Sequence, residues 1–89
     1  MSAPRIGITY CTKCNFLLRA TWMAQELLTT FGQELGEVTI IPGSGGIFEV
    51  TLDGEVIATN RDHAPIPDPS QVKRTVRDRI APDRKIGHD

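Results

Sequence analysis

This 89-residue chain contains two cysteines and two histidines and has no apolar run of membrane-spanning length. Two cysteines are too few for a scaffold stapled by several disulfides, and with His63 and His88 they lack the spacing of a zinc finger. The net charge of -1 argues against a nucleic-acid or membrane partner held by bulk electrostatics. The first residues show no signal-peptide core, so we expect a cytoplasmic protein. From the spacing of the cysteines and histidines we expect no metal site.

Both cysteines lie in one C-x-x-C motif, Cys11-Thr12-Lys13-Cys14, between an extended apolar segment and a helical pattern. Two intervening residues let the sulfurs approach bonding distance, and the start of a helix favours a thiolate. In a reducing compartment this motif is a poor structural staple, because closing so short a loop constrains the unfolded chain little. The motif therefore predicts a redox-active dithiol, with Cys11 as the attacking thiolate and Cys14 as the resolving one.

Hydrophobic periodicity predicts a single domain over residues 1–89, with the order strand, helix, strand, strand, strand, helix. The first crossover is long enough for a parallel pair of strands, and Asp53-Gly54 predicts an antiparallel hairpin. This is the minimal thioredoxin-like arrangement, an α/β fold with a four-stranded mixed sheet and two helices. The expected elements are strands at 5–10, 37–41 (ended by Pro42), 47–52 and 55–59, and helices from about 14 to 31 and from Pro69, capped by Asp68, to a stop at Pro82.

The first helix is expected to have two different faces. Leu18 and Trp22 are four residues apart and fall opposite the main apolar stripe. Two interpretations of this pair stay open: a second packed surface, or an exposed patch near the dithiol that docks a protein substrate or a second copy of the chain. The stripe predicted to be buried comprises Leu17, Ala20, Ala24, Leu27, Leu28 and Phe31.

Short motifs along nearly the whole chain accompany these elements. They are Tyr10-Cys11 with Cys14, Leu18-Arg19-Ala20, Ala24 to Leu28, Pro42-Gly43 with Gly45-Gly46 and Phe48, the Gly54 turn, Val76-Arg77-Asp78 and Gly87-His88. Together they resemble the selenoprotein W-related family, in particular its bacterial cysteine-containing members, the Rdx proteins. The resemblance implies a thioredoxin-like fold and a thiol-based redox role in oxidant defence, often linked to glutathione.

The resemblance also bears on the site. In the selenoprotein members, selenocysteine occupies the position that corresponds to Cys14, which favours the opposite order of attack. Many relatives carry Gly-Gly-Phe-Pro before the last helix, where this chain has His63-Ala64-Pro65-Ile66-Pro67. In a thioredoxin-like fold that loop lies near the dithiol, where glutaredoxins hold part of glutathione. This chain therefore differs from its relatives in the loop that would bind glutathione, the candidate co-substrate. Pro65, in the same loop, is a candidate substrate-binding residue.

Four more residues complete the predicted substrate site. Tyr10, next to the motif, is a candidate for shielding or orienting the thiol, although a strand tyrosine with a satisfied hydroxyl is the simpler interpretation. Lys13 adds a cation that would lower a cysteine pKa. Gly45 and Gly46 would leave backbone groups free to pair with a substrate.

The expected function is that of a thiol–disulfide oxidoreductase acting on disulfide, sulfenic or glutathionylated protein thiols. Glutathione or a thioredoxin system would supply the electrons, and no other cofactor is expected. One alternative is a redox-gated binding module that turns over no substrate; others are a zinc-bridged dimer or metal-delivery protein, and a pair of inert thiols. Catalytic reduction of a model disulfide separates the first two functions, and the metal content of anaerobically purified protein tests the zinc-bridged and metal-delivery hypotheses.

Overall fold

The computed structural model describes residues 3–87, so His88 lies outside the described part of the chain. The elements follow in the predicted order and confirm the α/β thioredoxin-like arrangement, with a mixed four-stranded sheet and two helices. They are β1 (Arg5–Cys11), α1 (Leu17–Phe31), β2 (Glu37–Gly43), β3 (Phe48–Leu52), β4 (Glu55–Thr59), the short 3-10 turn η1 (Arg61–His63) and α2 (Pro69–Ile80).

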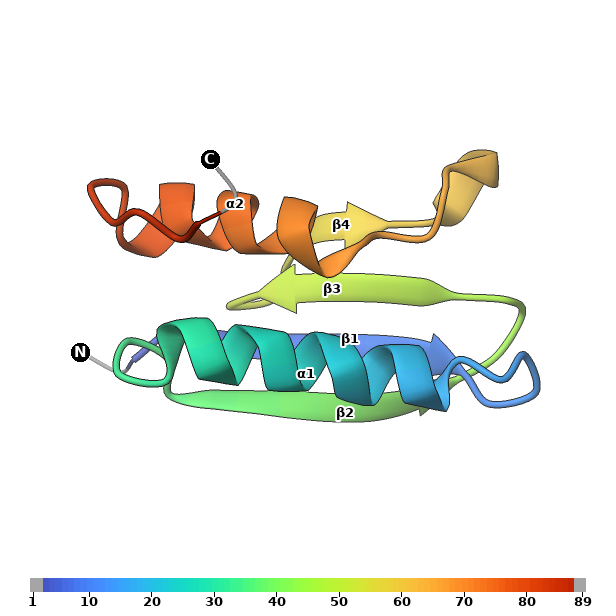
Figure 1. Ribbon diagram of the computed structural model, residues 1–89. Helices are drawn as coiled ribbons and strands as arrows, with labels where there is room; N and C mark the ends of the chain where they lie inside the picture. Colours follow the sequence, from blue (N-terminus) through green and yellow to red (C-terminus); the bar gives the residue numbers. More distant parts are fainter. Residues whose placement is uncertain (1–2, 88–89) are drawn as a thin grey trace.

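The sheet has the strand order β2-β1-β3-β4. β1 and β2 run parallel, from Arg5 opposite Glu37 to Cys11 opposite Gly43, and β3 pairs antiparallel with both β1 and β4. Both helices lie on the same face of the sheet, with α1 over β1 and β2 and α2 beside β4 (Figure 1). The predicted parallel crossover and the predicted hairpin are thus both confirmed.

The core fills the space between this sheet face and the helices. Burying one large apolar side chain contributes about 1.5–3 kcal/mol relative to leaving it exposed. The Lys73 ammonium on α2 meets the Glu26 carboxylate on α1 at 2.6 Å, which ties the two helices together. The largest fully buried side chains are Phe31, Phe48, Ile6, Ile8, Met23, Leu27, Val50, Val72 and Val76.

The buried stripe of α1 is rotated from the predicted one. Leu17 and Leu28 were expected in the core, but they are 51% and 47% exposed. Met23, outside the predicted stripe, is buried. The reason is that α1 packs against α2 as well as against β1 and β2, so its buried face is turned toward the second helix.

Several element boundaries also differ from the prediction. β1 ends one residue later, at Cys11, and β3 begins one residue later, at Phe48, while two differences are larger. α1 begins at Leu17 rather than near Cys14, because Asn15 has a left-handed backbone with φ of 58° that cannot belong to the helix. β2 continues through Pro42 to Gly43. A proline is tolerated there because β2 is an edge strand, where a missing N–H can face away from the sheet.

The start of α2 is as predicted. The Asp68 carboxylate accepts a hydrogen bond from the Gln71 N–H at 3.1 Å, and Pro69 occupies the first helical position. Hydrogen bonds from the Ser70 hydroxyl and from the Gln71 N–H hold the pKa of the Asp68 carboxyl below its ordinary value. Neither α1 nor α2, the helices of the described residues, is long and apolar enough to cross a membrane.

Candidate functional site

The two cysteines lie at the end of the sheet where the parallel strands finish. Cys11 is the last residue of β1, and Cys14 follows in the turn before α1. A disulfide joins them, with their Cα atoms 5.4 Å apart, inside the usual range for a bridge. The β1–α1 turn, the β2–β3 loop and η1 gather at this end of the molecule (Figure 1). We call it the dithiol end.

Backbone hydrogen bonds hold the motif against the β2–β3 loop. The Cys11 N–H donates to the Ile47 carbonyl at 2.8 Å, and the Thr12 N–H donates to the Gly43 carbonyl at 3.2 Å. The Cys14 N–H donates back to the Cys11 carbonyl at 3.4 Å and closes the turn. The backbone of the first cysteine is therefore fixed by the sheet, whereas the second cysteine lies in a turn outside it.

The two cysteines also differ in exposure. Cys11 is 3% exposed, and Cys14 is partly exposed. The expectation that a helix begins at Cys14 is wrong, so the partly positive helix end lies further along the chain, closer to Cys14 than to Cys11. The first turn of α1 has no side-chain cap and no acidic residue to offset that partial charge. Access and electrostatics thus both favour Cys14 as the sulfur that a partner reaches.

The predicted substrate-binding residues occupy different surroundings. Tyr10 is half-buried and packs against the core, while Lys13 is exposed in the turn of the motif. Gly45 and Gly46 have φ of 72° and 80°, a conformation that side chains disfavour, and they lie in the loop that contacts the dithiol. Pro65 is exposed in the loop before α2, and no hydrogen bond among those described joins it to the motif.

An open hollow of about 400 Å³ lies beside the β2–β3 loop. Its lining includes Thr9 of β1, residues 43–47 and residues 60–62. On the same rim, Arg61 donates to the Glu49 carboxylate at 2.6 Å. This hydrogen bond, aided by one from the Thr59 hydroxyl, holds the pKa of the Glu49 carboxyl below its ordinary value. The hollow is therefore polar and borders the segment that pairs with the motif.

A second hollow lies on the outer face of α1. Leu18 and Trp22 are 79% and 52% exposed, and they line an open hollow of about 620 Å³ that extends to Asn15 in the turn of the motif. The interpretation of these two side chains as a second packed surface is therefore wrong for the described chain. Docking of a partner at this place stays a prediction.

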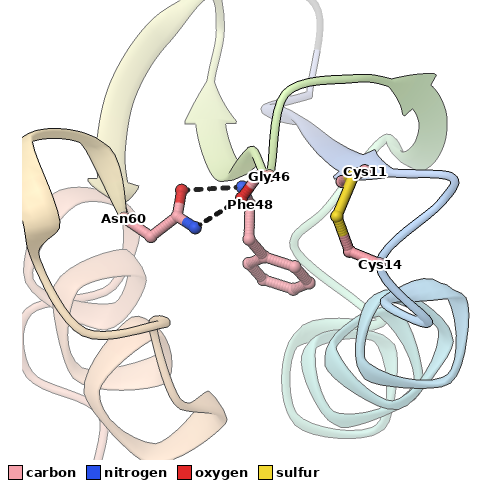
Figure 2. Close-up of a disulfide and its surroundings, with 5 residues drawn as sticks. All are labelled: Cys11, Cys14, Gly46, Phe48 and Asn60. Carbon is pink, nitrogen blue, oxygen red and sulfur yellow. Dashed lines mark hydrogen bonds between the residues drawn. A yellow bond between two sulfur atoms is a disulfide. The ribbon is translucent and has the colours of Figure 1, made fainter.

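One side chain at the dithiol end was not indicated by any sequence motif. Asn60 Oδ1 accepts from the Phe48 N–H at 2.8 Å, and Asn60 Nδ2 donates to the Gly46 carbonyl at 2.7 Å (Figure 2). The Asn60 N–H also donates to the Phe48 carbonyl at 3.1 Å. An asparagine after a β-branched strand is an ordinary turn signal, and its partners lie twelve and fourteen residues away. The β3–β4 register is needed to find this contact.

Metal ligands are not grouped in the part of the chain that the structure describes. Across residues 3–87, no three or more His, Cys, Asp and Glu side chains are placed to hold a metal ion. His63 is exposed in η1 and has a left-handed backbone with φ of 64°.

The chain is similar to known proteins along most of its length. The Rdx family model matches residues 5–78. A crystal structure of a protein from Bordetella parapertussis is 47% identical, with a TM-score of 0.83, and the match covers 88% of this chain and 99% of that chain. The structure of a selenoprotein W-related protein from Vibrio cholerae is 38% identical, with a TM-score of 0.81, and the match covers 86% of this chain and 96% of that chain. Comparison with curated proteins gives no match.

Proposed function

The chain belongs to the Rdx family, as the sequence motifs predicted, and from this premise we propose that it is a thiol–disulfide redox protein. Its substrates would be disulfide, sulfenic or glutathionylated thiols of other proteins, reduced in oxidant defence. The observation that supports the proposal most directly is the Cys11–Cys14 disulfide at the carboxyl end of β1, in which Cys14 is partly exposed. Such a pair can pass two electrons without any other cofactor.

The sequence predicted that Cys11 attacks first; the reaction proposed here has the opposite order and begins at Cys14, because Cys14 is the more exposed of the two residues. The Cys14 thiolate attacks a sulfur of the substrate disulfide, a mixed disulfide forms, and one substrate thiolate leaves. The Cys11 thiolate then attacks the Cys14 sulfur and releases the second substrate thiolate. Two electrons have moved to the substrate, and the Cys11–Cys14 disulfide remains. With a sulfenic substrate the first leaving group is water, and with a glutathionylated one the products are the free protein thiol and glutathione.

The surfaces next to the dithiol suggest how a protein substrate would lie. The hollow bordered by Gly45 and Gly46 offers backbone groups and polar side chains to an extended segment around the oxidised sulfur. Lys13 is exposed within the motif and would favour a thiolate or an acidic substrate. Pro65 remains a candidate for contacting the part of the substrate that lies further from the dithiol. A cytoplasmic location would supply thioredoxin or glutathione as the electron source.

Two measurements test the proposal. The first is the reduction potential of the pair, obtained by equilibrating the protein in glutathione buffers, trapping free thiols and counting them by mass spectrometry. We expect a Cys11–Cys14 disulfide with a potential between about -300 and -180 mV, the range of cytosolic reductants and glutaredoxin-like carriers. The second is catalytic turnover of a model disulfide with thioredoxin reductase or glutathione as electron source. A protein that is only ever oxidised once, with no turnover, would contradict the oxidoreductase proposal.

The exposed pair on α1 supports a second candidate function. Leu18 and Trp22 lie over a hollow that reaches the turn of the motif, so formation or loss of the disulfide could alter a docking surface for a partner or a second copy of the chain. In this redox-gated binding module, oxidation would change partner affinity and no substrate would be turned over. Partner affinity of the oxidised and reduced forms, measured beside turnover, separates the two functions.

A further inference from the structure

One peptide group links Asn60 to the dithiol. The peptide between Ile47 and Phe48 has its carbonyl bonded to the Cys11 N–H at 2.8 Å and its N–H bonded to Asn60 Oδ1 at 2.8 Å. The two bonds therefore use opposite ends of the same peptide group. Hydrogen bonds arranged in this way polarise each other, because an acceptor at the N–H makes the carbonyl oxygen a stronger acceptor. Asn60 thus acts on the backbone of Cys11 through a single intervening group.

The second bond of the same side chain restricts the loop that carries this peptide. Asn60 Nδ2 donates to the Gly46 carbonyl at 2.7 Å, while Oδ1 holds the Phe48 N–H (Figure 2). Gly45 and Gly46 have positive φ, and a Cβ atom at either position would have no atom within 4 Å apart from its own chain neighbours. Neither residue has side-chain packing to hold the loop in place. The amide of Asn60 supplies that restraint, since it offers one acceptor and one donor in the arrangement that the two backbone groups require.

From this chain of contacts we infer that Asn60 is a positioning residue for the resolving step of the dithiol. The inference rests on the proposed function, in which Cys11 attacks the Cys14 sulfur of the mixed disulfide and expels the substrate thiolate. By fixing the Ile47–Phe48 peptide, Asn60 holds the Cys11 backbone where its sulfur can reach Cys14. Without Asn60, the pairing of β1 with β2 still holds Cys11, but the Ile47–Phe48 peptide on its other side is less firmly held, so closure becomes slower and the internal disulfide less favoured.

The test follows ring closure in full-length protein. Reduced protein is mixed with oxidised glutathione, quenched at intervals with acid, which protonates the thiolates and stops exchange, and analysed by mass spectrometry for the Cys14–glutathione adduct and the internal disulfide. In Asn60→Ala we expect closure to slow about tenfold, the size of effect that the loss of two hydrogen bonds produces. The adduct would accumulate, and the equilibrium constant for the internal disulfide would fall by a similar factor, which corresponds to about 30 mV.

A matched control separates positioning from general stability. Asp53 Oδ1 accepts a hydrogen bond from the Arg5 N–H at 2.9 Å. This is also a bond from a side chain to a strand backbone, but Asp53 lies at the opposite end of β3, away from the dithiol. Asp53→Ala should lower the free energy of unfolding, as Asn60→Ala does, but leave ring closure at the wild-type rate. If Asn60→Ala destabilises the reduced protein yet closes at the wild-type rate, the inference is wrong and Asn60 is merely structural.

A second variant covers the case in which Asn60→Ala does not fold. Asn60→Asp keeps the acceptor for the Phe48 N–H but lacks the donor to the Gly46 carbonyl, so we expect closure between that of wild type and Asn60→Ala. Wild-type closure in Asn60→Asp, with the alanine variant unfolded, would overturn the inference. If the wild-type protein itself forms no internal disulfide, the proposed function fails and the inference fails with it. If the wild-type protein forms the internal disulfide and the Asn60 variants close at the wild-type rate, the inference about Asn60 is overturned and the proposed function stands.

Discussion

The two ends of the sheet are held in different ways. At the end away from the dithiol, Arg84 forms an ion pair with Glu34 and lies 5.3 Å from the centre of the buried Phe31 ring. Asp53 and the Gly36 N–H add hydrogen bonds to the start of β1. At the dithiol end, three loops meet through backbone hydrogen bonds and the amide of one asparagine, and the ion pair there joins Glu49 to the exposed side chain of Arg61. One end of the molecule thus closes the core and the other carries the partly exposed Cys14, so stability and the proposed redox chemistry should be separable by mutation.

The largest expected effect is at the dithiol end itself. Cys14→Ser should abolish turnover of a model disulfide, because the remaining sulfur of Cys11 is buried. Cys11→Ser should also abolish turnover but should accumulate a stable mixed disulfide at Cys14, which mass spectrometry of the trapped protein detects. Neither serine variant alters the far end, so both should remain folded. Turnover by Cys14→Ser would reverse the proposed order of attack.

The next largest effect is expected at the far end. Phe31 is fully buried and its ring contacts Arg84, so Phe31→Ala should lower the free energy of unfolding by about 3–5 kcal/mol. Urea unfolding of the reduced protein measures this change. Phe31→Leu, which keeps most of the volume, serves as the matched variant and should cost much less. If the folded leucine variant shifts the dithiol equilibrium as strongly as Asn60→Ala, the separation of the two ends is wrong.

A smaller effect is expected at the start of α2, which leads away from the dithiol end. Asp68→Ala removes the cap and should lower the free energy of unfolding by about 1 kcal/mol at neutral pH. The folded-state pKa of this carboxyl is lowered, so its stabilising charge is fully present above its ordinary pKa of 3.8 and is lost as the pH falls through the folded value. The stability difference between wild type and variant should therefore shrink in acid. A difference that grows as the pH falls below 4 would contradict this assignment.

The smallest effect on stability is expected on the outer face of α1. Trp22→Ala should lower the free energy of unfolding by at most about 1 kcal/mol, because about half of the side chain is already exposed, but it should weaken binding of an oxidised protein substrate. Leu28→Ala is the matched control, since Leu28 is also an exposed apolar side chain of α1 but lies outside the hollow. Equal loss of binding in both variants would show that the hollow has no special role in docking.

Local patterns were sufficient to predict the order of the elements. Strand alternation, the Asp53-Gly54 hairpin and the Asp68-Pro69 helix start each depend on residues close together in the chain, and each is confirmed. The position of the dithiol at the carboxyl end of β1 follows from the same patterns. These features were predictable because their physical causes act over a few residues.

The remaining features depend on contacts between distant segments. The burial of Met23 and the exposure of Leu28 follow from the packing of α1 on α2, which hydrophobicity along one helix does not reveal. Asn15 carried a usable signal, because asparagine tolerates the left-handed backbone that delays the helix. Asn60 carried almost none. Its role depends on the β3–β4 register and on a loop fourteen residues earlier.

The proline in β2 has a consequence for the behaviour of the protein in concentrated or stressed solution. Gly43 directs its carbonyl toward Thr12, so the adjacent Pro42, by the alternation of a strand, faces the outer edge of the sheet. An outer edge with free N–H groups is a template onto which unfolded chains add strands and aggregate. Pro42 removes one of those donors at the dithiol end. Under the proposed function, a protein that meets partly unfolded, oxidised chains there can undergo thiol–disulfide exchange with them while offering a poor seed for a growing sheet.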